Sequence, residues 1–314
     1  MKLSELAELK KILTYHDIKI SRESTGHQLK NLVDVIVRKY KDADAKAVND
    51  VLSNQYQILT ASFQSLELIV NKVIADIDTT IEEKSKSLLA LSDEYYKTEQ
   101  TKTASEILDL HGSPHYYNTD RFFSRILKYG DWKYPALVIH PGRETFIETM
   151  IDNDPLYIVD QSYDLLEPAV AKFNEAYQKR MRKYVVDEAS EDDILRDLPD
   201  LQFGICVVYH YFNFRPFAII QKYLGEIYKK LRPGGVVVFT FNSLDDDMAA
   251  ELTEESKRCI ASAKDLNDEI EKLGYEILFQ KNYYPGPGTW MELKKPGTLT
   301  STRGGQTLAK IVSK

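Results

Sequence analysis

The sequence predicts an α/β domain preceded by an all-α, coiled-coil-like helical domain. The first of the 11 prolines is Pro114, and no glycine lies between Gly26 and Gly112. Because proline and glycine interrupt helices, this long stretch is free to be almost entirely helical. Beyond Gly112, glycine and proline recur between short β-branched runs and amphipathic runs, which is typical of alternating strands and helices.

Length and composition indicate a soluble protein of more than one domain. We expect a helical arm over 1–112, an α/β domain over 113–294 and a basic tail over 295–314. The net charge of −7 argues against a nucleic-acid partner. Cys206 and Cys259 are too few for a disulfide framework, which favours a reducing compartment such as the cytoplasm. Neither a secretory leader nor a membrane partner is expected.

The arm carries a regular apolar repeat. Its members, separated by alternating steps of four and three, are Leu52, Tyr56, Leu59, Phe63, Leu66, Val70, Val73 and Ile77. This heptad spacing predicts a helix from about Ala43 to Tyr96, about 80 Å long at 1.5 Å per residue. A shorter helix over 27–39 could fold back against it. Two arrangements therefore stay open, a bundle within one chain and a coiled-coil stalk for homo-oligomerisation or for docking on a partner protein.

The second part of the chain alternates β-rich runs with helical runs. The expected strands are 136–139, 156–159 ending at Asp160, 184–186, 203–209 and 236–240. One expected helix begins near Thr145, and two others cover 165–173 and 217–231. Such alternation predicts parallel βαβ units with right-handed crossovers. An antiparallel hairpin is expected at the end, from 275–279 and 289–293 around the turn 285–288.

Two short motifs carry a resemblance to a known family. They are the run Leu-Arg-Pro-Gly-Gly-Val-Val-Val over 231–238, before the fifth strand, and Val-Asp-Gln-Ser over 159–162, at the end of the second. From about 134 to 294 the chain resembles the class I S-adenosylmethionine-dependent methyltransferases. The resemblance implies a mostly parallel, Rossmann-like seven-stranded sheet, a C-terminal antiparallel hairpin and S-adenosylmethionine as cofactor.

The resemblance also implies which residues bind the cofactor. In an open parallel sheet, ligands lie beyond the carboxyl ends of the strands at the topological switch point. Asp160 is then placed to accept hydrogen bonds from the ribose hydroxyls. Asp187, or its neighbour Glu188, would accept from the adenine amino group. His140 and Gly142, in the loop after the first strand, complete the implied cofactor-binding set.

That loop departs from the family pattern. The family has an acid in the first strand and several glycines after it, whereas this chain has Val138, His140 and Glu144 at three of those places. A side chain where φ must be positive costs on the order of 1–2 kcal/mol and fills ligand space. Glu144 would also face the cofactor's own carboxylate. His140 and Arg143 could bind that carboxylate in a rearranged site, or the site could be inactive.

The catalytic candidates are Tyr209 and His210, which follow the fourth strand. His210 has a side chain suited to general-base chemistry near neutral pH, and the alternative is a loop histidine packed among aromatic rings. Amino-methylating members of the family often carry Asn or Asp, two prolines and an aromatic residue here. This chain has Asn-Phe-Arg-Pro over 213–216 instead. His111 and His115 flank a helix-breaking Gly-Ser-Pro, so no metal site is expected.

The end of the chain is basic. Residues 294–314 contain five basic residues and no acidic one, so we expect this tail to dock on a partner.

Two functions from different classes follow from the sequence. The first is an S-adenosylmethionine-dependent methyltransferase of unknown methyl acceptor. The second is a catalytically inactive methyltransferase fold that serves as a structural or docking component of a large assembly, such as a virion.

Overall fold

A computed structural model gives the fold of the protein. The residues that it describes are 3–15, 27, 45–101, 124–141, 145–189, 193–245, 249, 258–282 and 288–299. The chain divides into two compact units, Met1–Glu83 and Lys84–Lys314, and the helix α3 contributes residues to both. The expected arm boundary at residue 112 and the tail beyond residue 299 lie outside the described residues.

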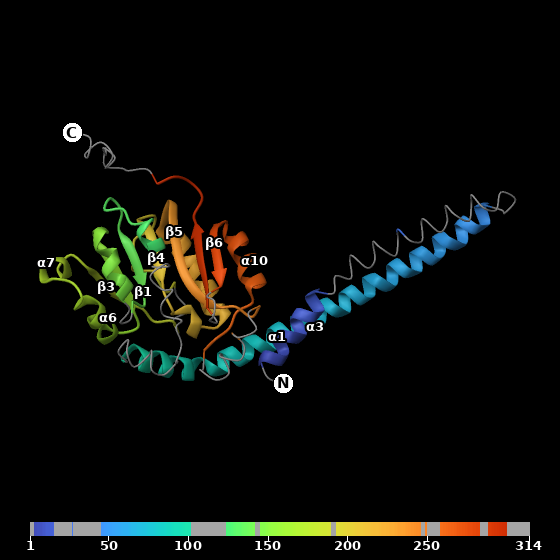
Figure 1. The fold of residues 1–314 in the computed structure, drawn as a ribbon, viewed down its shortest axis with the longest axis horizontal. Coiled ribbons are helices and arrows are strands. Elements are labelled where there is room, and N and C mark those ends of the chain that lie inside the picture. The colour runs from blue at the N-terminus through green and yellow to red at the C-terminus, as the bar shows by residue number, and fades with distance from the viewer. Residues whose placement is uncertain are drawn as a thin grey trace. The chain divides into compact units, whose positions relative to one another are not determined.

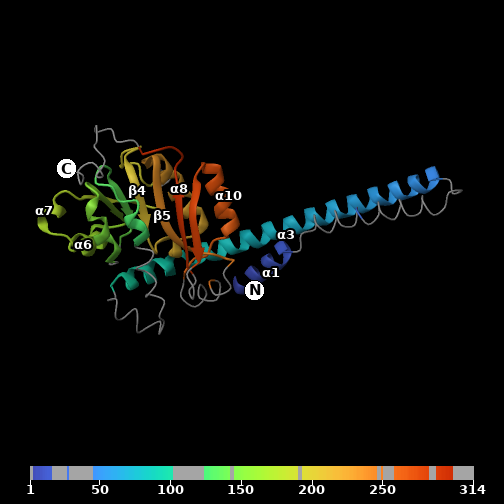
Figure 2. The same ribbon diagram turned by 45° about the horizontal axis from the view of Figure 1, so that its top comes forward.

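The first unit is built from two described helices, α1 (Leu3–Tyr15) and the start of α3 (Ala45–Thr101). The 57 residues of α3 confirm the predicted long helix. Beside it lies α1 (Figure 2), where Lys10 forms an ion pair with Asp78. Leu6 on α1 and Ile77, the last member of the apolar repeat on α3, are both buried. The predicted helix over 27–39 lies outside the described residues, apart from residue 27.

The middle of α3 exposes large apolar side chains. Those that belong to the predicted repeat are Tyr56, Leu66 and Val73, and those outside it are Ile58, Leu68 and Ile69. By length and composition alone, the stretch Ser53–Glu94 would suffice to cross a membrane, with an 18-residue window of mean hydropathy 1.3. The coiled-coil partnership of this helix stays a prediction.

The second unit contains a seven-stranded sheet (Figure 1), consistent with a Rossmann-like methyltransferase fold. Its strands are β1 (Ala136–Ile139), β2 (Leu156–Asp160), β3 (Arg182–Val185), β4 (Phe203–Val208), β5 (Leu231–Asn242), β6 (Glu276–Asn282) and β7 (Gly288–Lys294). The spatial order is β3-β2-β1-β4-β5-β7-β6. The first five strands are mutually parallel, whereas β7 runs antiparallel to both β5 and β6. The predicted mixed sheet and its terminal hairpin are confirmed.

Alternate residues of the central strands face two helical layers. Leu137 and Ile139 belong to the core on one side, and Ala136 and Val138 to the core on the other. The first core includes apolar residues of α8 (Phe217–Lys230) and α10 (Ala263–Leu273). The second includes residues of η2 (Thr145–Asp152), α6 (Tyr163–Val170) and α7 (Glu175–Gln178). Burial of both sheet faces explains why these strands read as continuous apolar runs.

Three local features differ from or extend the expectations. The element after β1 is the 3₁₀ helix η2 rather than an α-helix. The helix α10 was not expected, although Ser262 caps its start by accepting from the Asp265 amide and Gly274 ends it at φ 81°. In the Pro-Gly-Gly turn, Gly234 also has φ 81°, a conformation that a side chain would strain.

Candidate functional site

The site lies at the carboxyl ends of β1 and β2, where the strand order reverses between β1 and β4. This is the topological switch point, at which open parallel sheets bind ligands. His140 follows β1 directly, and Asp160 is the last residue of β2. Both side chains are buried, with about 1% of each residue exposed. The fold thus brings together two of the predicted cofactor-binding residues.

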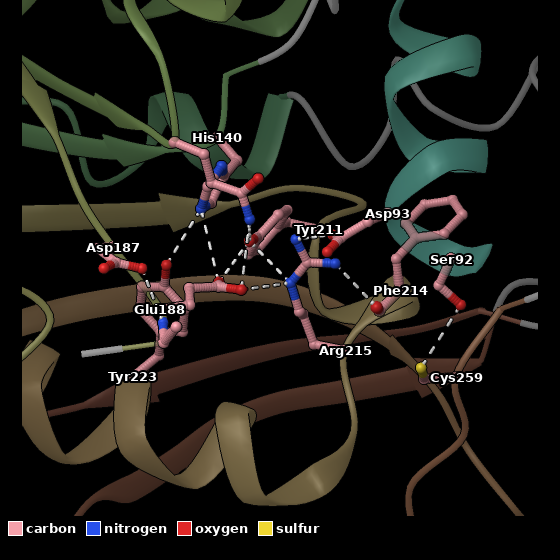
Figure 3. A network of polar contacts seen from close by, with 12 residues as sticks. Ser92, Asp93, His140, Asp187, Glu188, Tyr211, Phe214, Arg215, Tyr223 and Cys259 are labelled. Atoms are coloured by element: carbon pink, nitrogen blue, oxygen red, sulfur yellow. Dashed lines mark hydrogen bonds and ion pairs between the residues drawn. The ribbon is translucent and has the colours of Figure 1, made fainter. Parts of the chain in front are cut away.

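His140 is held on three sides (Figure 3). Its Nδ1 lies 2.8 Å from Asp160 Oδ1. Its Nε2 lies 3.1 Å from the Tyr223 hydroxyl on α8. Its ring stacks on Tyr211, with the two centroids 3.3 Å apart. The backbone of His140 is left-handed, with φ 51°, a conformation that favours glycine. The position therefore keeps a glycine-like backbone but directs an imidazole into the site.

The Tyr211 hydroxyl is the centre of a network of hydrogen bonds that joins Gln161, Glu188 and Arg215. It donates to Glu188 Oε1 and accepts from Gln161 Nε2 at 3.1 Å and from Arg215 Nε at 2.7 Å. Burial raises the pKa of Tyr211 well above its ordinary value. The phenol therefore stays protonated and acts as a hydrogen-bond donor at physiological pH.

Arg215 connects this network to α3. Its side chain is completely buried, with Nε 2.9 Å from Glu188 Oε2 and Nη2 2.6 Å from Asp93 Oδ1. Its Nη1 donates to the Phe214 carbonyl at 3.0 Å. Burial alone would lower the pKa of Arg215, but Tyr211, Glu188 and Asp93 outweigh that effect and raise it. The guanidinium is therefore a permanent buried positive charge.

A pocket of about 480 Å³ opens beside the network. Its lining consists of Leu89, Asp93, Gln161, Val185, Val186, Asp187, Glu188, Ala189 and Ile219. The charged side chains in this lining are all carboxylates, so an added anion is disfavoured unless it replaces one of them.

The residues at the switch point do not fit S-adenosylmethionine in this arrangement. Asp160 Oδ1 already accepts from His140 and from the Gln161 amide, the latter at 2.7 Å. Its Oδ2 is buried and has no hydrogen-bond partner among the described residues. The carboxylate that the resemblance assigns to the ribose is thus enclosed by His140 and Gln161. Gly142, Arg143 and Glu144 lie outside the described residues.

The two acids at the end of β3 have different environments. Asp187 is exposed, lines the pocket and accepts from the Ala189 amide at 3.0 Å, which is a local turn contact. Glu188 is instead drawn into the network with Tyr211 and Arg215. Asp187 is therefore an exposed carboxylate of the pocket lining, whereas Glu188 supplies the negative charge that faces the buried Arg215.

The two catalytic candidates lie outside this network. Tyr209 and His210 stack on each other with centroids 4.1 Å apart, and the His210 amide donates to Thr240 Oγ1 at 2.8 Å. Burial, followed by the charge of Arg258, lowers the pKa of His210 from 6.5 to about 3. An imidazole with so low a pKa is a weak general base at neutral pH.

Asn213, in the place of the family's amide or acid, has a structural environment. Its Nδ2 donates to Asn242 Oδ1 at 2.6 Å, and its Oδ1 accepts from Thr240 Oγ1 at 2.9 Å. Its backbone carbonyl accepts from the Cys259 amide at 2.9 Å. These bonds fix the loop after β4 against β5 and occupy the side-chain groups that a methyl acceptor would need.

Sequence reasoning missed the residues that surround His140. Tyr211, Tyr223, Arg215 and Asp93 come from a loop and two helices far apart in the chain, and only the fold brings them together. One signal was present, because Arg215 lies in a run of aromatic residues where an unpaired charge would be costly. Within the described part of the chain, no group of three or more His, Cys, Asp or Glu residues could hold a metal ion.

Comparisons with known proteins show similarity at the level of the fold. No family model and no curated protein matches the sequence. The N-methyltransferase NodS from Bradyrhizobium japonicum, solved with S-adenosyl-L-homocysteine, is 13% identical over 65% of this chain and 98% of its own, with a TM-score of 0.49. Geranyl diphosphate C-methyltransferase from Streptomyces coelicolor, also solved with S-adenosyl-L-homocysteine, is 8% identical over 57% and 76%, with a TM-score of 0.47. An S-adenosylmethionine-dependent methyltransferase from Mesorhizobium loti is 10% identical over 55% and 95%, with a TM-score of 0.43.

Proposed function

We propose that this protein is a methyltransferase fold that has lost catalysis and acts as a structural or docking component of a larger assembly. The observation that carries the proposal is the contact between His140 and Asp160, 2.8 Å long and fully buried. It takes up Oδ1 of the carboxylate that a ribose would need, and Oδ2 stays buried with no hydrogen-bond partner among the described residues. Tyr211 and Tyr223 hold the imidazole in place from two further sides.

Energetics favour the closed arrangement over cofactor binding. A cofactor ribose would have to displace the His140 ring and break its contacts to both Asp160 and Tyr223. Buried donors and acceptors left without partners cost about 1–3 kcal/mol each. The ligand would regain only part of this, because Asp160 Oδ1 also accepts from the Gln161 amide.

Cofactor titration with thermal unfolding tests the proposal. The wild-type protein should show no shift in melting temperature with millimolar S-adenosylmethionine. The double variant His140→Gly/Glu144→Gly removes both side chains and should gain a shift that depends on ligand concentration. At 100 times the dissociation constant the stabilisation is about 2.7 kcal/mol, which corresponds to several degrees in a domain of this size.

His210→Gly provides a matched control. His210 is also a loop histidine with positive φ, 59°, but it does not contact Asp160. This variant should gain no cofactor binding. A wild-type protein that binds S-adenosylmethionine and loses the binding in His140→Gly would overturn the proposal.

A second candidate function is a methyltransferase with a rearranged cofactor site. The observation in its favour is the 480 Å³ pocket, which adjoins Gln161, Asp187 and Glu188 at the expected cofactor edge. In this case the cofactor would enter from the β3 side and His140 would be part of a working site. The titration above separates the two candidates, because they predict opposite responses to His140→Gly.

The partners implied by the first candidate are proteins. The exposed apolar side chains of α3 suit self-association or a partner helix, and the basic residues of 294–314 suit an acidic surface. Both contacts, and the placement of the protein in the cytoplasm or in a virion, belong to this proposal.

A further inference from the structure

The segment Lys84–Glu94 of α3 packs on the α/β unit through small side chains. Ser85 and Ser92 are wholly buried, and both contact Cys259. The Ser92 Oγ lies 3.8 Å from Cys259 Sγ, which itself lies 3.9 Å from the Ser85 carbonyl. Leu91, by contrast, is 41% exposed. Leu88 and Leu89 are half-buried, and no apolar side chain of the segment is fully buried. Its contact with the rest of the second unit is therefore released at a lower cost than that of a core helix.

Asp93 makes the contact of this segment with Arg215 (Figure 3). Arg215 Nε is satisfied by Tyr211 and Glu188, and Nη1 by the Phe214 carbonyl. Nη2 faces Asp93 Oδ1 at 2.6 Å, yet neither of these two atoms makes a hydrogen bond among the described residues. The ion pair is therefore close in distance but poorly aligned.

The misalignment leaves binding capacity unused. A guanidinium and a well-placed carboxylate form short, aligned hydrogen bonds, which are about twice as strong as neutral ones. A buried nitrogen such as Nη2 that lacks them is under-satisfied. The Asp93 side chain is 31% exposed and lines the 480 Å³ pocket, so its position can be reached from solvent.

Charge balance defines what can take this position. Arg215 already faces Glu188, and the pocket holds further acids, so a ligand anion added beside Asp93 would be repelled. A carboxylate that replaces Asp93 leaves the total charge unchanged. It is also free to orient its two oxygens toward Nη2, which Asp93, fixed to a helix, does not do.

We propose that Arg215 forms a carboxylate-binding site, that Asp93 fills it as an internal stand-in for the ligand, and that Lys84–Glu94 is a releasable strap over it. The ligand is a molecule or a partner side chain that bears a carboxylate. It enters from the pocket as Asp93 leaves and pairs with Arg215 Nη2. The site does not depend on S-adenosylmethionine binding and goes beyond the proposed function.

Chemical rescue of Asp93→Ala in the full-length chain tests the site. The variant leaves Arg215 without its second anion and should melt below wild type. Sodium acetate, titrated to about 100 mM against sodium chloride of equal ionic strength, should then raise its melting temperature by several degrees in a saturating manner. Acetamide, which is neutral and of similar shape, should give no rescue. The wild-type protein, with Asp93 in place, should respond to acetate no more than to chloride.

Asp187→Ala is the matched control, since Asp187 lines the same pocket but is exposed and pairs with the Ala189 amide rather than with Arg215. It should show no rescue by acetate. Asp93→Asn, which keeps the side-chain volume, allows the same titration where Asp93→Ala does not fold. Equal effects of acetate and chloride on both Asp93 variants would overturn the proposal. So would an acetate effect of the same size in Asp187→Ala and in wild type.

Discussion

At the scale of single residues, His140 places a side chain of the protein itself at the topological switch point. Its backbone keeps φ 51°, a conformation that a side chain disfavours by on the order of 1–2 kcal/mol. The contacts of the His140 side chain with Asp160, Tyr223 and Tyr211 offset this backbone strain. They supply the buried imidazole with two polar partners and a stacked ring. The residue is therefore best understood as part of the core.

Asp160→Ala should destabilise the protein by roughly 2–5 kcal/mol. The change leaves His140 Nδ1 and the Gln161 amide without their acceptor, at about 1–3 kcal/mol for each buried group. Urea denaturation of the full-length protein measures the effect. Asp187→Ala removes an exposed carboxylate and should stay within about 0.5 kcal/mol of wild type. Equal stability of the two variants would contradict the role assigned to Asp160.

His210 should make folding stability sensitive to pH. Its folded pKa of about 3 lies below the ordinary 6.5, so the unfolded chain binds a proton that the folded chain does not. The stabilisation is complete above about pH 6.5 and is lost as pH falls toward the folded value, by up to about 1.4 kcal/mol per pH unit.

The variant His210→Asn tests this slope, since asparagine tolerates positive φ and does not titrate. Between pH 6.5 and 5, above the range in which most carboxylates titrate, its free energy of unfolding should change less steeply with pH than that of wild type. The difference between the two slopes should correspond to about one proton bound by the unfolded wild-type chain and not by the folded one. Identical slopes would show that His210 is accessible to solvent.

At the scale of elements, β7 holds a buried carboxylate. Glu292 is wholly buried and accepts from Arg125 Nη2 at 2.8 Å and from Trp290 Nε1 at 2.9 Å. Burial raises the pKa of Glu292, but the hydrogen bonds from Arg125, Tyr129 and Trp290 outweigh that effect and lower it. Arg125 precedes β1 in the chain, so these contacts link the segment before β1 to β7, the last strand of the sheet.

Arg125→Met should cost about 3–5 kcal/mol, because it leaves Glu292 as a buried charge without its counter-ion. The double variant Arg125→Met/Glu292→Met removes both charges and should recover much of that loss. Urea denaturation of the two variants supplies the comparison. A double variant no more stable than Arg125→Met would contradict the assignment of the loss to an unpaired carboxylate.

At the scale of the whole molecule, the arm should cause self-association. Tyr56, Leu66 and Val73 lie at heptad spacing on α3 and are exposed. Phe63 belongs to the same repeat, and Phe63→Asp would place a charge in the interface. Sedimentation of the full-length wild-type protein should show an oligomer, which Phe63→Asp weakens by at least tenfold in dissociation constant.

Ser65→Asp is the control for that measurement, since Ser65 lies outside the repeat and is exposed. It should associate as wild type does. A wild-type monomer at high micromolar concentration would favour the alternative of a bundle folded within one chain.

The sequence by itself determined the elements of this protein, because their signals are local. Proline and glycine placement predicted the long helix α3, and apolar runs predicted five parallel strands and the terminal hairpin within about two residues, apart from the longer β5 and β6. Asp160 could be placed at a strand end by the same reasoning. The helix α10 was missed although its caps, Ser262 and Gly274, were present in the sequence.

Only the tertiary structure decided what Asp160 contacts. Its partner His140 is 20 residues away, and the supporting Tyr223 is 83 residues from His140. Asp93 reaches Arg215 from a different helix again. Such contacts depend on strand order and on helix packing, which bring distant side chains together at the switch point and have no periodic signal in the chain. For this reason the sequence located the site, and the fold determined that its own side chains fill it.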